Sequence, residues 1–119
     1  MDRRSLLTLT VAAALPAAAN ADAPPKRYFV LSHVPGPAWD HAKGFGDQPG
    51  IEHHVGYMKP IFEAGKIVLG GPFLDNSGGM MILDVATVEE ATAIAGADPT
   101  VKAGLLIVTV RPWMAAFAR

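Results

Sequence analysis

Residues 66–85 read KIVLGGPFLDNSGGMMILDV and have the pattern of a β-hairpin. Two largely apolar runs, 66–73 and 80–85, are separated by Asn76, Ser77 and two glycines, which are residue types that form tight turns. A hairpin joins two antiparallel strands that are neighbours in a sheet. We therefore expect two adjacent strands here, and the rest of the fold depends on what lies on each side of them.

The chain before the hairpin starts with another strand. The β-branched and aromatic residues of RYFVLSHV at 27–34 favour an extended conformation. Alternation along a strand places Phe29, Leu31 and His33 on one face. A loop containing glycine and proline follows over 38–49, and its length for so small a domain indicates a functional role.

A helix is expected between this loop and the hairpin. It should begin near Gly50 and end at Gly65, because glycine is frequent just after the last helical residue. Pro60 lies within it and predicts a kink. The core-facing stripe predicted from helical spacing comprises Ile51, Val55, Met58 and Phe62.

The chain after the hairpin repeats the helix and strand. Thr87 with Glu90 forms a capping-box pattern at the start of a helix. Asp98 is expected to cap a further turn, with Pro99 at its first position. The run LLIVTV at 105–110 predicts the last strand, which should end at Arg111-Pro112-Trp113. The residues expected to face inward from the helix are Val88, Ala91 and Ala95.

This order, β-α-β-β-α-β, predicts an α+β fold with a ferredoxin-like subunit. Such a sheet carries helices on one face, yet the expected strands are apolar on both faces. The apolar strand residues are Ile67, Leu69, Met81, Leu83, Leu106 and Val108, with largely apolar neighbours between them. A second copy packed sheet against sheet is the simplest cover, so we expect a homodimer.

The first 21 residues have the pattern of an export signal. Arg3 and Arg4 precede a short apolar run, and small residues around Ala19 and Ala21 match a cleavage site. The arginine pair resembles a twin-arginine signal, with general secretory export and an uncleaved anchor as alternatives. We expect residues 22–27 to form a tether, residues 28–117 to form the domain, and the mature protein to be periplasmic or secreted.

Bulk composition excludes several classes of function. The formal net charge of −1 gives no positive charge excess of the kind that binds nucleic acid or an anionic membrane. The chain has no cysteine, so it cannot be held together by disulfides. The four histidines show no metal-ligand spacing, and no phosphate-binding loop is present, so we expect neither a metal nor a cofactor.

His54 is the leading candidate for chemistry. It shares a helical face with Tyr57, beside the core stripe, whereas the adjacent His53 is turned toward solvent. The alternative for His54 is a half-buried histidine that is merely hydrogen-bonded. Asp75 follows the second strand, where it either bonds its own turn or orients a histidine for proton transfer.

Other residues are candidates for binding a ligand. Gly71 lacks a side chain next to Asp75 and leaves either close packing or room for a ligand against the backbone. Arg111 suits an anionic group, with a surface salt bridge as the alternative. The candidate walls and auxiliary groups of the pocket are His33, Trp39, Tyr57 and Phe73.

Taken in order, these motifs resemble the YCII-related family from about Tyr28 to Phe117. The shared motifs are HVGY at 54–57, GK at 65–66, GPFLD at 71–75, EEA at 89–91, DP at 98–99, GL at 104–105 and RPW at 111–113. The resemblance implies a dimeric α+β barrel and a pocket with a histidine–aspartate pair, here His54 and Asp75. One branch of the family is similar to dehydrochlorinases, and muconolactone isomerase-type enzymes share the barrel.

These residues favour a small enzyme without a cofactor, in which His54 moves a proton on a small cyclic or aromatic compound. Asp75 would orient the imidazole, giving lyase, isomerase or dehydrochlorinase-like chemistry. A periplasmic dimer that binds or senses a small ligand without reacting is the alternative. A purely structural role for the dimer also remains open.

Overall fold

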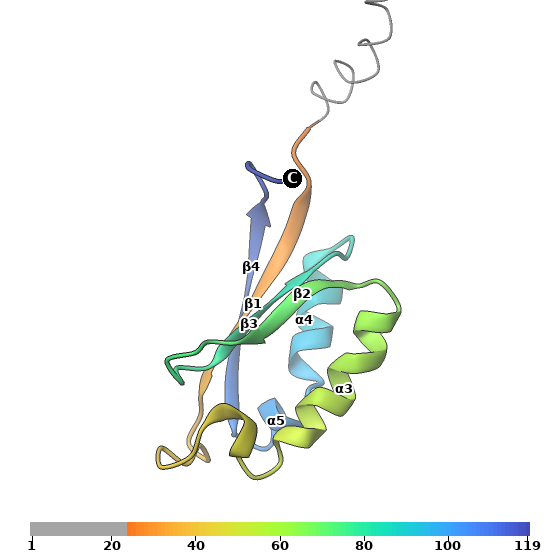
Figure 1. Cartoon of the computed structure of the whole chain (residues 1–119). Coiled ribbons are helices and arrows are strands. Elements are labelled where there is room, and N and C mark those ends of the chain that lie inside the picture. The colour runs from red at the N-terminus through yellow and green to blue at the C-terminus, as the bar shows by residue number, and fades with distance from the viewer. Residues whose placement is uncertain (1–23) are drawn as a thin grey trace, which may run out of the picture.

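The computed structural model describes residues 24–119, and the expected export signal lies outside them. Four strands and three helices follow one another with a short 3₁₀ turn (Figure 1). Their bounds are β1 Arg27–Pro35, η2 Phe45–Asp47, α3 Ile51–Glu63, β2 Ile67–Pro72, β3 Gly79–Leu83, α4 Val88–Gly96, α5 Pro99–Lys102 and β4 Leu106–Met114. The predicted order of elements is confirmed, and the fold is ferredoxin-like α+β. None of the helices within residues 24–119 is long and apolar enough to cross a membrane.

The strands form one antiparallel sheet in the order β2-β3-β1-β4. The hairpin of β2 and β3 is joined through Phe73 N, which donates to the carbonyl of Gly78. The central strand β1 pairs with β3, where Leu31 lies opposite Met81, and with β4, where Leu31 lies opposite Val110. Helices α3 and α4 lie on the same side of this sheet (Figure 1).

The last strand is longer than the sequence indicated. It continues through Pro112, which lies opposite Phe29, and ends at Met114. The prediction that the strand spans 105–110 and is ended by Arg111-Pro112-Trp113 is therefore wrong. Proline is tolerated here because β4 is an edge strand with a neighbour on one side only, and a backbone N–H on its other side would have no strand to bond.

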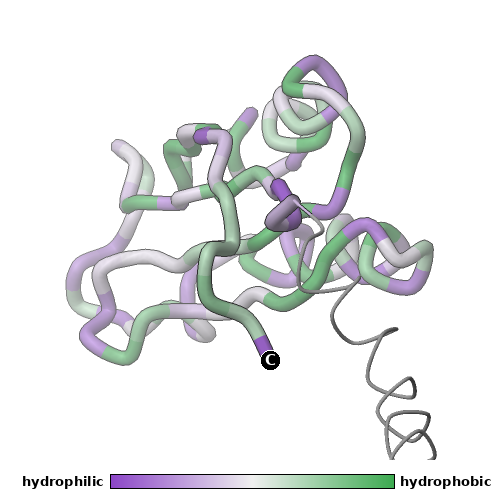
Figure 2. Tube along the Cα trace, turned by 90° about the horizontal axis from the view of Figure 1, so that it is seen from above, coloured by the Kyte–Doolittle hydropathy of each residue, from purple (hydrophilic) through white to green (hydrophobic). Residues whose placement is uncertain are grey.

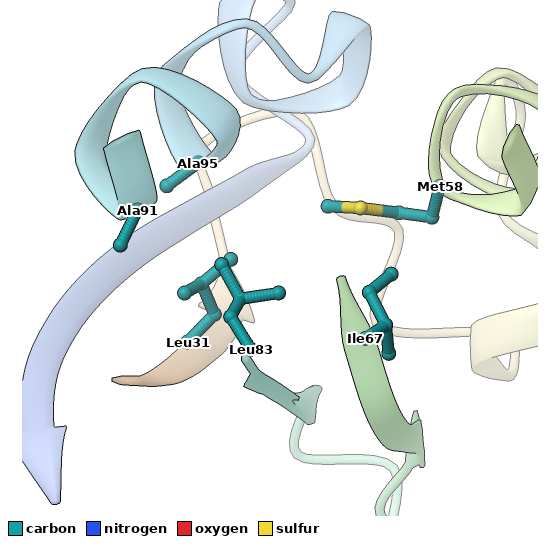
Figure 3. Close-up of a cluster of buried hydrophobic side chains, with 6 residues drawn as sticks. All are labelled: Leu31, Met58, Ile67, Leu83, Ala91 and Ala95. Carbon is teal, nitrogen blue, oxygen red and sulfur yellow. The ribbon is translucent and has the colours of Figure 1, made fainter. Parts of the chain in front are cut away.

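The main core lies between the inner face of the sheet and the two longer helices. Six buried residues form it, and Figure 3 shows Ala91 and Ala95 of α4 above Leu31 and Leu83, with Met58 of α3 facing Ile67. The two alanines let α4 approach the sheet closely. The prediction that Val88, Ala91 and Ala95 face inward is confirmed for both alanines. It is wrong for Val88, which is 43 % exposed at the start of the helix.

Helix α3 is rotated relative to the predicted stripe. Ile51 and Met58 are buried as expected, but Val55 and Phe62 are more than half exposed. The third buried residue of the helix is His54. The helix passes through Pro60, and Gly65 adopts the positive φ of 82° that its predicted position after the helix requires.

The face of the sheet opposite the helices carries many apolar residues and, within the described chain, is uncovered. Along β1 and β4 this face carries Val34 opposite Ile107 and Tyr28 opposite Trp113. Figure 2 shows hydrophobic residues along the trace of the sheet as well as along the helices. This surface, called here the outer face, has the apolar residues Tyr28, Val30, Val34, Leu69, Ile82, Ile107 and Trp113, of which Val34, Leu69, Ile107 and Trp113 are exposed. Ser32, Thr109 and Arg111 share the face and are polar.

Candidate functional site

A buried histidine–aspartate pair lies where α3 meets α5. The Nδ1 atom of His54 is 2.5 Å from the Oδ2 atom of Asp98, and both side chains are almost fully buried. The predicted pairing of His54 with Asp75 is wrong. Asp75 lies in the exposed hairpin turn, where it accepts hydrogen bonds from the backbone N–H and the hydroxyl of Ser77.

The local structure explains why Asp98 is well placed. It is the N-cap of α5, and its Oδ1 atom accepts from the backbone N–H and the hydroxyl of Thr100. These bonds fix the carboxylate and leave Oδ2 for His54. The sequence did predict Asp98 as a cap, but nothing in it showed that α3 and α5 pack together across 44 residues of chain.

The electrostatic state of the pair follows from its surroundings. Burial opposes the charged form of Asp98, but the hydrogen bonds from His54 and Thr100 outweigh it, so the pKa of Asp98 is lowered. The carboxylate is therefore ionised and accepts, so Nδ1 of His54 donates. In the neutral ring the proton then sits on Nδ1, which leaves the Nε2 lone pair able to take up a proton.

A second histidine adjoins the pair. The ring of His33, on β1, meets the ring of His54 edge to face at a centroid distance of 5.1 Å. Its Nε2 atom lies 3.9 Å from Oδ2 of Asp98, beyond hydrogen-bonding distance. Burial, followed by the neighbouring His54, lowers the pKa of His33 to about 4 although Asp98 acts in the opposite direction. His33 is therefore neutral at pH 7.

Both histidines line a pocket of about 290 Å³ between α3 and the β2–β3 hairpin. Its walls are mostly apolar, and Lys59 adds one cationic group. The residues that line it are His33, Phe45, His54, Val55, Met58, Lys59, Phe62, Ile67, Gly70, Gly71, Pro72, Gly79, Met80 and Met81. Val55 and Phe62 of α3, which are more than half exposed, thus face the pocket rather than the core.

Gly71, predicted to bind a ligand, lies among the residues that line the pocket. A Cβ atom placed on it would meet no other atom within 4 Å. Gly70 differs, because a Cβ there would lie 2.7 Å from the Met81 side chain. Gly70 faces the helices and is required by close packing, whereas a Cβ on Gly71 would point to the opposite face of the sheet, because Gly71 pairs with Met80 and Met80 with Ser32.

The remaining predicted residues do not line this pocket. Trp39 is buried in a second core cluster, with its ring 5.8 Å from that of Phe45. Tyr57 donates its hydroxyl to the carbonyl of Ile94. Phe73 is partly exposed beyond the hairpin strand, and Arg111 is exposed on β4, opposite Val30.

The comparisons with known proteins show the family to which the chain belongs. The model of the family described as YCII-related domain matches residues 41–114. The chain therefore belongs to the YCII-related family, as its motifs indicated. It is 28 % identical over 67 residues to the uncharacterized protein YjpA of Bacillus subtilis (strain 168), a match that covers 56 % of this chain and 79 % of that protein. No solved structure matches.

Proposed function

We propose that this protein is an enzyme that transfers a proton on a small, apolar, cyclic or aromatic compound. The observation that carries the proposal is the His54–Asp98 pair, whose imidazole lines a largely apolar pocket. A carboxylate that orients a histidine and stabilises its charged form is the usual arrangement of a general base. The reaction class is that of a lyase, isomerase or dehydrochlorinase.

The pocket supplies the other requirements of such a reaction. Apolar walls formed by Met58, Phe62 and Met81 favour a ring over a polar chain. Lys59 lies at the same pocket and would favour a substrate that develops negative charge on an oxygen when a carbon-bound proton is removed. Gly70 and Gly71 line the pocket through their backbone, so no side chain of theirs narrows it at β2.

Replacing His54 by glutamine is expected to lower proton transfer by about 10²- to 10⁴-fold, because the general base is lost while a polar side chain of similar reach remains. The reaction can be followed without knowing its product. Cyclic ketones, lactones and halogenated phenols are incubated with the protein in D₂O, and exchange of carbon-bound hydrogen is measured by ¹H NMR. The matched control is His53→Gln, on the exposed side of the same helix.

A second test compares Asp98, which bonds His54, with Asp75, which does not. Asp98→Asn keeps an oxygen to cap α5 but removes the charge that orients the imidazole, so exchange should fall. Asp75→Asn should leave exchange unchanged, because Asp75 bonds only within its own turn. Full exchange in His54→Gln would refute the proposal. Compounds that bind without exchanging would instead favour the ligand-binding module that the sequence left open.

We further propose that the protein is a homodimer in which the outer faces of two sheets pack together, giving a dimeric α+β barrel. The apolar pairs Val34–Ile107 and Tyr28–Trp113 support this, because exposed apolar residues gathered on one face of a sheet mark an association surface. Ser32, Thr109 and Arg111 lie between the two pairs and would add polar contacts to the interface. A second copy presents the same apolar residues, so the contact is self-complementary about a two-fold axis.

Ile107→Glu is expected to convert the dimer to a monomer, because it would bury an unpaired charge in the apolar end of the outer face, beside Val34. Light scattering after size-exclusion chromatography measures the mass at micromolar concentration. Val88→Glu is the matched control, since Val88 is similarly exposed but lies on α4, in the helical layer. A wild-type mass equal to one chain would rule out the dimer.

A further inference from the structure

His33 has a buried ring nitrogen that is not satisfied. The residue is 1 % exposed, and among residues 24–119 its Nε2 is the buried side-chain nitrogen or oxygen atom that has no hydrogen-bond partner. Native structures rarely leave such an atom unpaired, and each case calls for an explanation such as an ion or a water molecule. The proposed proton transfer uses His54 and Asp98 and gives His33 no role.

The unpaired nitrogen points to a cluster of three potential metal ligands. His33 comes from β1, His54 from α3, and Asp98 from the cap of α5, so three separate elements converge there. One ligand atom from each lies within 4.8 Å of the others, and all three residues are buried. Sequence spacing could not reveal this set, because the three residues are distant along the chain. The lack of metal-ligand spacing among the histidines therefore did not exclude a cluster that contains His33 and His54.

The donor set has the chemistry of a transition-metal site. Two imidazole nitrogens and one carboxylate oxygen are the three protein ligands found in many catalytic zinc sites, which keep a fourth position open. The carboxylate is also fixed from behind, because Thr100 holds Oδ1 of Asp98 with two hydrogen bonds. Such bonds from outside the ligand set orient metal ligands and strengthen the site.

We propose that His33, His54 and Asp98 bind a first-row divalent transition metal ion such as Zn²⁺, with its open position toward the pocket that His33 and His54 line. Ligand atoms around a tetrahedral zinc ion lie about 3.3 Å apart. The His54–Asp98 hydrogen bond of 2.5 Å would therefore open, and the 3.9 Å separation of His33 from Asp98 would shorten. Each of these two changes is less than about 1 Å.

The metal-bound state excludes the proton-transfer state, and in this respect the inference rests on the proposed function. When Nδ1 of His54 binds the ion, the proton of its neutral ring sits on Nε2. That nitrogen then has no lone pair with which to accept a proton from a substrate. Zinc should accordingly inhibit the exchange reaction, and a chelator should restore it.

The test uses the full mature chain, purified without a polyhistidine tag and treated with a chelator. Titration with Co²⁺ is followed by visible absorption, and Zn²⁺ is then added in competition. We expect one ion per chain. His33→Phe keeps a buried ring against His54 but removes the ligand atom. Losing a residue that only hydrogen-bonds a metal ligand weakens metal binding roughly 10- to 100-fold, and losing the ligand itself should weaken it more. His53→Phe makes the same change at an exposed histidine and should leave the affinity unchanged.

Two results would overturn the inference. One is wild-type protein that binds no Co²⁺ or Zn²⁺ at millimolar concentration, and the other is a folded His33→Phe variant that binds as tightly as wild type. If that variant does not fold, ¹⁵N NMR of the wild-type imidazoles decides. Zn²⁺ must then shift the signals of His33 and His54 and leave those of His41 and His53 in place, and an unchanged His33 signal rejects the site.

These outcomes are separate from those that test the proposed function. Proton exchange that is lost in His54→Gln, in a chain that binds no metal, would sustain the proposed function and reject the metal site. Stoichiometric metal binding in a chain that exchanges no proton from any compound would do the reverse.

Discussion

Asp98→Ala is expected to lower the free energy of unfolding by about 3 to 5 kcal/mol, the largest effect of any single substitution considered. Losing the cap of α5 costs about 1 kcal/mol. The buried donors of His54 and Thr100 also lose their acceptor, and each unsatisfied buried group costs about 1–3 kcal/mol. Urea unfolding at pH 7 measures the change, which should lower the melting temperature by at least about 10 °C.

Two further substitutions make this result specific. Asp98→Asn retains an oxygen that can cap the helix and should destabilise the protein less than alanine does. Asp75→Ala removes an exposed carboxylate that bonds only Ser77 and should cost about 1 kcal/mol or less. Equal destabilisation by Asp98→Ala and Asp75→Ala would contradict the buried pair.

The second large effect concerns acid stability and depends on His33. Burial lowers the pKa of His33 from 6.5 to about 4, so the folded chain holds fewer protons than the unfolded chain between these values. Stability therefore falls as the pH drops from about 6.5 to about 4. For metal-free protein, this one group should remove about 2 to 3 kcal/mol between pH 7.5 and pH 4.5.

His33→Phe supplies the comparison, because phenylalanine keeps the buried ring but cannot take up a proton. Urea unfolding of both proteins at pH 7.5 and pH 4.5, with a chelator present, gives the pH-dependent loss for each. The loss should be smaller in the variant by the contribution of His33. The prediction fails if both proteins lose the same free energy of unfolding.

The sequence predicted the fold well because local patterns specify each element. Alternation along RYFVLSHV correctly placed Leu31 and His33 on the buried face. The caps at Thr87 and Asp98 also form as predicted, since an N-cap is a contact within one turn of chain. The rotation of α3 about its axis was predicted wrongly for Val55 and Phe62, because an apolar stripe on a helix can face either a core or the wall of a pocket.

The candidate site was predicted in part, and its error has a physical origin. His54 was identified correctly as the helix histidine that turns inward. Its partner was assigned to Asp75 by motif, whereas the contact is made by Asp98, which local analysis described only as a cap. The sequence near Asp98 reveals its local role as the cap of α5. Its contact with His54 depends on the packing of α3 against α5, which the sequence does not show.

The carboxylate of Asp98 makes hydrogen bonds to two helices, so binding in the pocket should affect the thermal stability of the whole domain. One carboxylate oxygen holds the start of α5 and the other holds the ring that lines the pocket. A ligand that binds the folded chain raises its melting temperature by mass action, by an amount set by concentration relative to the dissociation constant. Differential scanning fluorimetry could therefore identify compounds for this protein before any reaction is known, with Asp98→Asn as the variant whose response should be reduced.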